Sequence, residues 1–261
     1  MVGLGLGMVL YMFLMIYGAM VMQSVIEEKS SRVLEVVVSS VRPFELMMGK
    51  IFGVASVAVV QVLIWAVLVC GAGAAVMPHV LPDGAMEAAA ALQQGGGAAT
   101  AAAGDFDPET LGAIALATDV SYLAMLFGYL LLFVVGGYLL YSAMFAAVGS
   151  AVDNAQDAAQ LQTPIMIPII LAVIVEMSVL NDPNSPLAFW FSLIPFTSPV
   201  VMMARIPYGI PTWEIVLSLV LLYAAFVGMV WLSAKIYRVG IFMYGKKPTL
   251  REMFRWIRYK Y

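Results

Sequence analysis

Residues 2–25 read VGLGLGMVLYMFLMIYGAMVMQSV and contain no charged side chain. About 20 consecutive apolar residues in a helix cross the roughly 30 Å hydrocarbon core of a bilayer, so this stretch predicts a membrane span. Four further segments are nearly free of charge, namely 51–77, 119–150, 164–180 and 214–235. We therefore predict an all-α fold, a polytopic transmembrane helical bundle with five spans in this chain.

The composition supports a membrane protein and disfavours several kinds of site. Of 261 residues, 63% are hydrophobic and 11% are charged, whereas soluble domains are about half apolar and about a quarter charged. The chain has one cysteine, Cys70, and one histidine, His79. A disulfide within the chain is therefore excluded, and a histidine-based metal site or a catalytic triad is disfavoured.

Two segments between the spans differ from them in composition. Residues 78–118 are rich in alanine and glycine and lack lysine and arginine, which predicts an external loop with one short helix at 85–94. Residues 183–211 are apolar but carry prolines at 183, 186, 195, 199, 207 and 211. Prolines at this density disfavour a straight span and favour short, re-entrant outer helices.

Basic residues predict the orientation in the membrane. They follow the first span at Lys29, Arg32, Arg42 and Lys50, and they follow the last span from Lys235 onward. Lysine and arginine mark cytoplasmic loops, so both segments are expected in the cytoplasm. Residues 237–261 are predicted to form a basic amphipathic cytoplasmic tail, in which Thr249 and Glu252 form a capping box. Five spans then leave Met1 outside, and an upstream span is expected to precede it. The alternative is an N-terminus that lies outside on a short tail.

The segment between the first two spans predicts an amphipathic helix. Residues 26–41 read IEEKSSRVLEVVVSSV, with apolar residues on one face and Glu28, Arg32 and Glu35 on the other. Such a helix lies along the membrane surface or against another protein, although a helical connecting loop is the simpler alternative. Pro43 then suits the first turn of the next helix.

Two stretches resemble a known family. Residues 26–54, IEEKSSRVLEVVVSSVRPFELMMGKIFGV, and residues 192–206, SLIPFTSPVVMMARI, resemble the permease subunits of ABC-2-type exporters. Within that superfamily the chain looks most like the sodium-efflux (NatB-like) permease group. The resemblance implies six spans in full-length relatives, with a large extracellular domain after the first, and this chain is expected to begin after that domain. It also implies that 26–41 is the coupling helix that contacts the ATPase subunit. The implied contact residues are Glu27, Glu28, Lys29, Arg32 and Glu35.

ATP and Mg²⁺ are expected on a partner chain. Residues 240–247, GIFMYGKK, match the start of a phosphate-binding loop, but Lys247 replaces the serine or threonine that would hold magnesium, and Pro248 follows. We therefore expect no cofactor or metal on this chain.

Glu176 and Gln61 are the candidate pathway residues. Glu176 is an acid inside an apolar run and is a candidate ion or proton contact. Its nearness to Asn181 and Asp182 favours the alternative that it reaches water at the outer boundary. Gln61 lies near the middle of the second span, where a hydrogen bond between helices is the commoner use.

These observations predict the permease subunit of an ATP-driven exporter in the inner (cytoplasmic) membrane, not itself an enzyme. Its expected partners are a separate ATPase subunit, a second permease copy (identical or not) and membrane lipid, without nucleic acid. A non-transporting scaffold or assembly protein is the alternative. The sequence lacks the paired residues that an intramembrane enzyme would need. Its spans also show no convincing repeats of the kind that a secondary carrier has. Sodium, a drug-like molecule, a peptide and a lipid all remain open as substrates.

Overall fold

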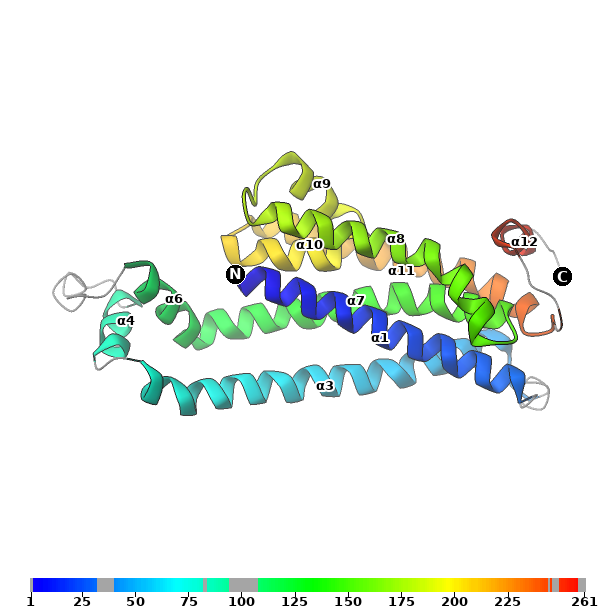
Figure 1. Cartoon of the computed structure of the whole chain (residues 1–261), viewed down its shortest axis with the longest axis horizontal. Helices are drawn as coiled ribbons and strands as arrows, with labels where there is room; N and C mark the ends of the chain where they lie inside the picture. Colours follow the sequence, from blue (N-terminus) through cyan, green and yellow to red (C-terminus); the bar gives the residue numbers. More distant parts are fainter. Residues whose placement is uncertain are drawn as a thin grey trace. The chain divides into compact units, whose positions relative to one another are not determined.

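The computed structural model describes residues 2–31, 40–81, 84–93, 108–243, 245 and 249–257, and no strand occurs in these ranges. Five helices are long and apolar enough to cross a membrane (Figure 1). They are α1 (Val2–Ser30), α3 (Pro43–Val80), α7 (Val120–Ala151), α8 (Ala155–Val179) and α11 (Thr212–Gly240). The predicted all-α bundle with five spans is confirmed.

The chain divides into two compact units. The large unit comprises Met1–Val59 and Leu130–Tyr261, and the small unit comprises Val60–Tyr129. Helices α3 and α7 contribute residues to both units, because each runs across a boundary between them.

The core of the large unit forms where α1 packs against α8 and α10 (Ser198–Arg205). Small residues permit the close approach of these helices. A Cβ at Gly3 would collide with the backbone carbonyl of Ala204 in α10, and a Cβ at Gly18 would collide with the ring of Phe145 in α7, which also packs against α1. All eight residues of α10 are buried, so this short helix lies inside the unit.

The proline-rich segment forms three short helices, as its prolines predict. These are α9 (Pro186–Leu193), α10 and the 3-10 helix η1 (Ile206–Tyr208), and each has a proline in its first two positions. Proline is tolerated there because the first N–H groups of a helix have no intrahelical acceptor. Ser185 caps α9 by accepting a hydrogen bond from Ala188 N.

Several helix boundaries differ from the prediction. Helix α1 continues to Ser30, so Glu27, Glu28 and Lys29 belong to its last turns and not to a separate helix that starts at residue 26. Residues 32–39 of the predicted coupling helix lie outside the described residues. Helix α3 starts at Pro43, the proline expected in its first turn, and not at residue 51.

Helix α8 starts at Ala155, well before the predicted residue 164. Asn154 caps it by accepting a hydrogen bond from Asp157 N, and Pro164 and Pro168 lie in its interior. The sequence predicts that this span starts at Pro164. Prolines can nevertheless lie inside a membrane helix, because neighbouring groups satisfy the backbone carbonyls that they leave unpaired.

Two helices of the small unit occupy the predicted external loop. Helix α4 (Ala85–Gln93) matches the expected helix at 85–94, and α6 (Pro108–Thr118) was not predicted. Their contact is a small apolar cluster, formed by Leu81, Ala85, Ala89, Ile114 and Ala115. In the tail, α12 (Leu250–Trp256) starts at the predicted capping box of Thr249 and Glu252.

Candidate functional site

Lys29, in the last turn of α1, is fully buried in the large unit. Its Nζ donates to the carbonyl oxygens of Ser150 at 2.8 Å and Gly240 at 2.9 Å. The same Nζ lies 3.1 Å from Asp153 Oδ1. A lysine ammonium group has three hydrogen atoms to donate, and three acceptors surround it here. The end of α1 is thereby attached to the ends of α7 and α11.

Glycine makes this arrangement possible. A Cβ at Gly240 would lie 2.8 Å from the carbonyl oxygen of Ser150, and a Cβ at Gly149 would lie 2.8 Å from the carbonyl oxygen of Met22. Both distances are too short for a real Cβ. The three helix ends can therefore meet around one amino group only because these positions lack side chains.

Lys50 links α1 to α3 beside this point. Its Nζ lies 2.7 Å from Glu28 Oε1 and donates to Ser24 through both the carbonyl oxygen and Oγ, at 3.0 and 2.8 Å. Glu28 is half-buried by the contact. We call Glu28, Lys29, Lys50 and Asp153 the Lys29 cluster.

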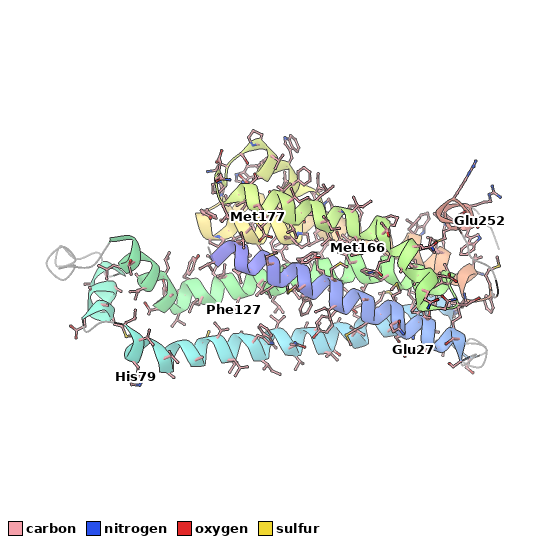
Figure 2. All side chains as sticks on the ribbon, in the orientation of Figure 1. Glu27, His79, Phe127, Met166, Met177 and Glu252 are labelled. Carbon is pink, nitrogen blue, oxygen red and sulfur yellow. The ribbon has the colours of Figure 1, made fainter. Side chains whose placement is uncertain are left out.

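The Lys29 cluster revises the predicted contact set for a partner. Lys29 has no exposed surface, so it cannot itself contact another chain, and Glu28 is engaged by Lys50. Glu27 remains exposed near the end of α1 (Figure 2). Its Oε1 accepts a hydrogen bond from Gln23 Nε2 at 3.2 Å. Arg32 and Glu35 lie outside the described residues.

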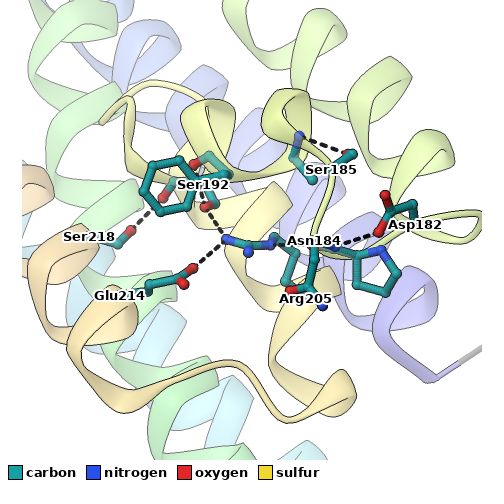
Figure 3. A network of polar contacts seen from close by, with 10 residues as sticks. Asp182, Asn184, Ser185, Ser192, Arg205, Glu214 and Ser218 are labelled. Atoms are coloured by element: carbon teal, nitrogen blue, oxygen red, sulfur yellow. Dashed lines mark hydrogen bonds and ion pairs between the residues drawn. The ribbon is translucent and has the colours of Figure 1, made fainter.

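A second polar cluster lies among α9, α10 and α11. Arg205 is 1% exposed, and its Nη1 lies 3.0 Å from Glu214 Oε2 and donates to Ser192 Oγ at 2.6 Å (Figure 3). Its Nε donates to the carbonyl oxygen of Pro183 at 2.8 Å. Ser218 Oγ completes the network by donating to the carbonyl oxygen of Ser192. We call Ser192, Arg205, Glu214 and Ser218 the Arg205 cluster.

The sequence contains a signal for this cluster. Arg205 is an isolated cation in an apolar, proline-broken segment, and Glu214 stands at the start of the last span. A buried guanidinium needs a carboxylate or several acceptors, so the pair could have been proposed from the sequence.

Glu176 of α8 lies at the interface with α1. It is fully buried, and neither carboxylate oxygen has a hydrogen-bond partner among the described residues. A Cβ added at Gly7 of α1 would collide with Glu176 Oε1, so the carboxyl group occupies space that the glycine leaves free. The preferred expectation that Glu176 reaches outer water is therefore wrong for this structure.

Gln61, the other candidate pathway residue, is exposed on α3 in the small unit. Within the described ranges, no group of three or more His, Cys, Asp or Glu side chains is arranged to hold a metal ion. The ionisable groups that are buried in the large unit and bear on a site are therefore those of the two ion-paired clusters and the carboxyl group of Glu176.

Comparisons with known proteins confirm the resemblance at the level of the ABC-2 family. The sequence model of a family described as "ABC-2 family transporter protein" matches residues 1–235. The uncharacterized protein YhaP of Bacillus subtilis is 27% identical over 246 residues, which are 94% of this chain and 52% of YhaP. The uncharacterized protein MJ1024 of Methanocaldococcus jannaschii is 27% identical over 254 residues, which are 97% of this chain and 52% of that protein. This chain therefore spans about half the length of both relatives. No solved structure is a significant match.

Proposed function

Because the chain belongs to the ABC-2 family of transporter proteins, we propose that it is the membrane-spanning permease subunit of an exporter driven by a separate ATPase subunit. The observation that carries the proposal is the family match over residues 1–235. This range includes four of the five apolar helices completely and all of α11 except its last residues. Hydrolysis of ATP then belongs to the partner, and this chain supplies the path through the membrane.

We propose that the protein lies in the inner membrane, with the Lys29 cluster on the cytoplasmic side. Supporting this, the contact from Lys29 Nζ to the Gly240 carbonyl joins the ends of α1 and α11. Both ends are followed by basic residues, which favour the cytoplasmic side. The proposal makes 78–118 external and the tail 237–261 cytoplasmic.

The proposed contact with the ATPase subunit begins at the exposed end of α1. Glu27 presents its carboxylate there, and Arg32 and Glu35 extend the contact if the family's coupling helix follows. Lys29 is a positioning residue in this scheme, because it holds the end of α1 against α7 and α11. A movement of the coupling segment would thus be transmitted to α1, α7 and α11.

Glu176 is the proposed residue on the substrate path, with a cation such as sodium as the substrate that its chemistry favours. The NatB-like resemblance and the unpartnered buried carboxyl group both support this choice. Ionised carboxylates in an apolar site need a counter-charge, which a transported cation would supply. Gln61 is the weaker candidate because it lies exposed on α3. Two permease copies, identical or not, would enclose the path.

Purification tests the proposal. The protein is isolated from its native membranes, co-purifying chains are searched for a complete phosphate-binding loop, and ATP hydrolysis and transport in vesicles are measured. We expect Glu27→Lys to weaken co-purification by about tenfold, because like charges across an interface cost affinity. The matched control is Glu87→Lys on α4, which is also exposed but lies in the proposed external segment. Equal effects of the two variants would contradict the contact.

The same experiment separates an exporter from a non-transporting scaffold. An exporter moves substrate only with ATP hydrolysis, and Glu176→Gln should lower cation transport by about tenfold while leaving co-purification intact. A complex that hydrolyses ATP at the same rate with and without every cation and organic substrate tested, and transports none, would favour the scaffold.

A further inference from the structure

A basic hollow lies in the large unit where α3 begins and α11 ends. It has a volume of about 460 Å³ and is lined by Arg42, Pro43, Phe44, Trp231, Ala234, Lys235 and Arg238. We propose that this hollow binds the phosphate of an anionic phospholipid, whose acyl chains lie along the exposed apolar side of α11. The proposal goes beyond transport and does not require the ATPase subunit.

The charge of the hollow suits a phosphate group. Three of its lining residues, Arg42, Lys235 and Arg238, are cationic, and none of its lining residues is acidic. None of the three cations has an ion-pair partner among the described residues. Arginine and lysine together are the side chains that bind phosphate oxygens, arginine through its planar fork and lysine as a point charge.

The backbone adds to this charge. Helix α3 starts at Pro43, which lines the hollow, so the N-terminal turn of a long helix opens there. The first N–H groups of a helix have no intrahelical acceptor and carry partial positive charge, which favours an anion. Glu45 does not line the hollow, but its Oε2 accepts a hydrogen bond from Arg42 N at 3.4 Å, so the side-chain cations and not the helix end supply most of the attraction for an anion.

The aromatic residues of the hollow distinguish a lipid from a soluble phosphate. Trp231 is 60% exposed and Phe44 is 49% exposed. Both belong to helices that can span a membrane, so their exposed rings can face lipid. Lys235 Nζ lies 3.8 Å from the centre of the Trp231 ring, which holds the ammonium group over the indole. Tryptophan is enriched at the depth of lipid headgroups, beside lysine and arginine.

An apolar path leads away from the cations. Val220, Val227 and Trp231 are exposed on α11 at spacings of seven and four residues, which place them on one side of the helix. Lys235 follows four residues later on that side. A phosphate at the hollow with an acyl chain along this side satisfies both kinds of surface, whereas a free phosphate ion uses only the first.

Native mass spectrometry in detergent tests the proposal with phosphatidylglycerol and phosphatidylcholine as probes. The test variant is Lys235→Gln/Arg238→Gln, and the control is Arg251→Gln/Arg255→Gln, which removes the same charge from exposed positions of α12. Each basic residue near anionic lipid contributes enough to predict at least about a tenfold loss of phosphatidylglycerol binding in the test variant. The control should change it less than about twofold, and Lys235→Arg/Arg238→Lys should restore it.

Four results would overturn the proposal. They are unchanged phosphatidylglycerol binding in the test variant, equal binding of phosphatidylcholine and phosphatidylglycerol, failure of the charge-preserving variant to bind, and displacement of the lipid by millimolar glycerol phosphate. The last would assign the hollow to a soluble phosphate. Unchanged lipid binding with weaker ATPase co-purification would assign it instead to an acidic surface of the partner.

Discussion

Lys29 and Arg205 are both buried cations of the large unit, but the groups that accept their hydrogen bonds differ. Lys29 is surrounded by two backbone carbonyls and the carboxylate of Asp153, whose side chain is 31% exposed. Arg205 is paired with Glu214, whose side chain is 10% exposed, and it also binds Ser192 Oγ and one carbonyl. The first cation depends mainly on the backbone, and the second depends mainly on side chains.

The backbone acceptors of Lys29 come from helix ends. Ser150 and Gly240 lie in the last turns of α7 and α11, where carbonyls lack intrahelical donors and carry partial negative charge. The ammonium group of Lys29, in the last turn of α1, therefore donates to carbonyl groups at the ends of two other helices. Arg205 instead connects the short helices α9 and α10 to α11. One cluster joins spans, and the other folds the segment between two spans.

The largest loss of stability is expected for Lys29→Met. This change leaves Asp153 and the Ser150 carbonyl without their cation, while the Gly240 carbonyl keeps the hydrogen bond that it accepts from Met243 N. Removing one partner of a buried pair costs about 3–5 kcal/mol, to which the Ser150 carbonyl adds about 1–3 kcal/mol. Chemical unfolding in detergent, followed by tryptophan fluorescence, would measure it. Arg251→Met on the exposed side of α12 is the control and should change the free energy of unfolding by less than about 0.5 kcal/mol.

A somewhat smaller loss is expected for Arg205→Met, about 3 kcal/mol, because Glu214 then remains buried without a cation. The double variant Arg205→Met/Glu214→Met should recover more than half of this loss, since apolar side chains can replace a buried pair at little cost. Lys29→Met/Asp153→Asn should recover little, because its main acceptors are carbonyls that no substitution removes. Equal recovery in the two double variants would break the distinction between the clusters.

Much of this fold follows from the sequence, and the reasons lie in particular elements. Charge-free stretches of sufficient length identify α1, α3, α7, α8 and α11 because a bilayer demands internally bonded helices. The capping box at Thr249 and Glu252 identifies the start of α12 for a local reason, the need to satisfy its first N–H groups. Prolines likewise identify the short helices α9 and α10.

The sites were harder to predict because they depend on helix ends that are distant in the sequence. Lys29 looks like a surface residue in the run EEKSS, and only the approach of Ser150 and Gly240 makes it buried. Glu176 looks interfacial because Asn181 follows closely, yet Gly7 on another helix provides the space that buries it. No local pattern reports such a contact.

The third-largest loss of stability is expected where the backbone of α1 contacts α10. Gly3→Ala should destabilise the protein by about 1–3 kcal/mol, because its Cβ meets the Ala204 carbonyl and backbone atoms cannot move aside as a side chain does. Gly5→Ala is the matched control on the same helix, since a Cβ there would meet no atom of another element within 4 Å. It should be neutral or should stabilise the helix by up to about 1 kcal/mol. Equal loss in both would show that α1 does not pack on α10 in this register.

The smallest effect on stability is expected for Glu176→Met, the same replacement at the third buried ionisable group. Unlike Lys29 and Arg205, Glu176 has no hydrogen-bond partner among the described residues, so its removal leaves no orphaned group behind. Replacing a buried, unsatisfied polar group by an apolar one of similar size is neutral or stabilising, here by less than about 1 kcal/mol.

Chemical unfolding of this variant would be measured beside the Lys29 and Arg205 variants. A loss above about 2 kcal/mol would mean that Glu176 has a stabilising partner in the membrane. A carboxyl group that the fold does not need costs free energy to bury, and this is what we expect of a residue that serves the proposed transport of a cation. Unchanged stability together with impaired cation transport would therefore complete the contrast: two ionisable groups that hold the helices together, and one that the helices merely enclose.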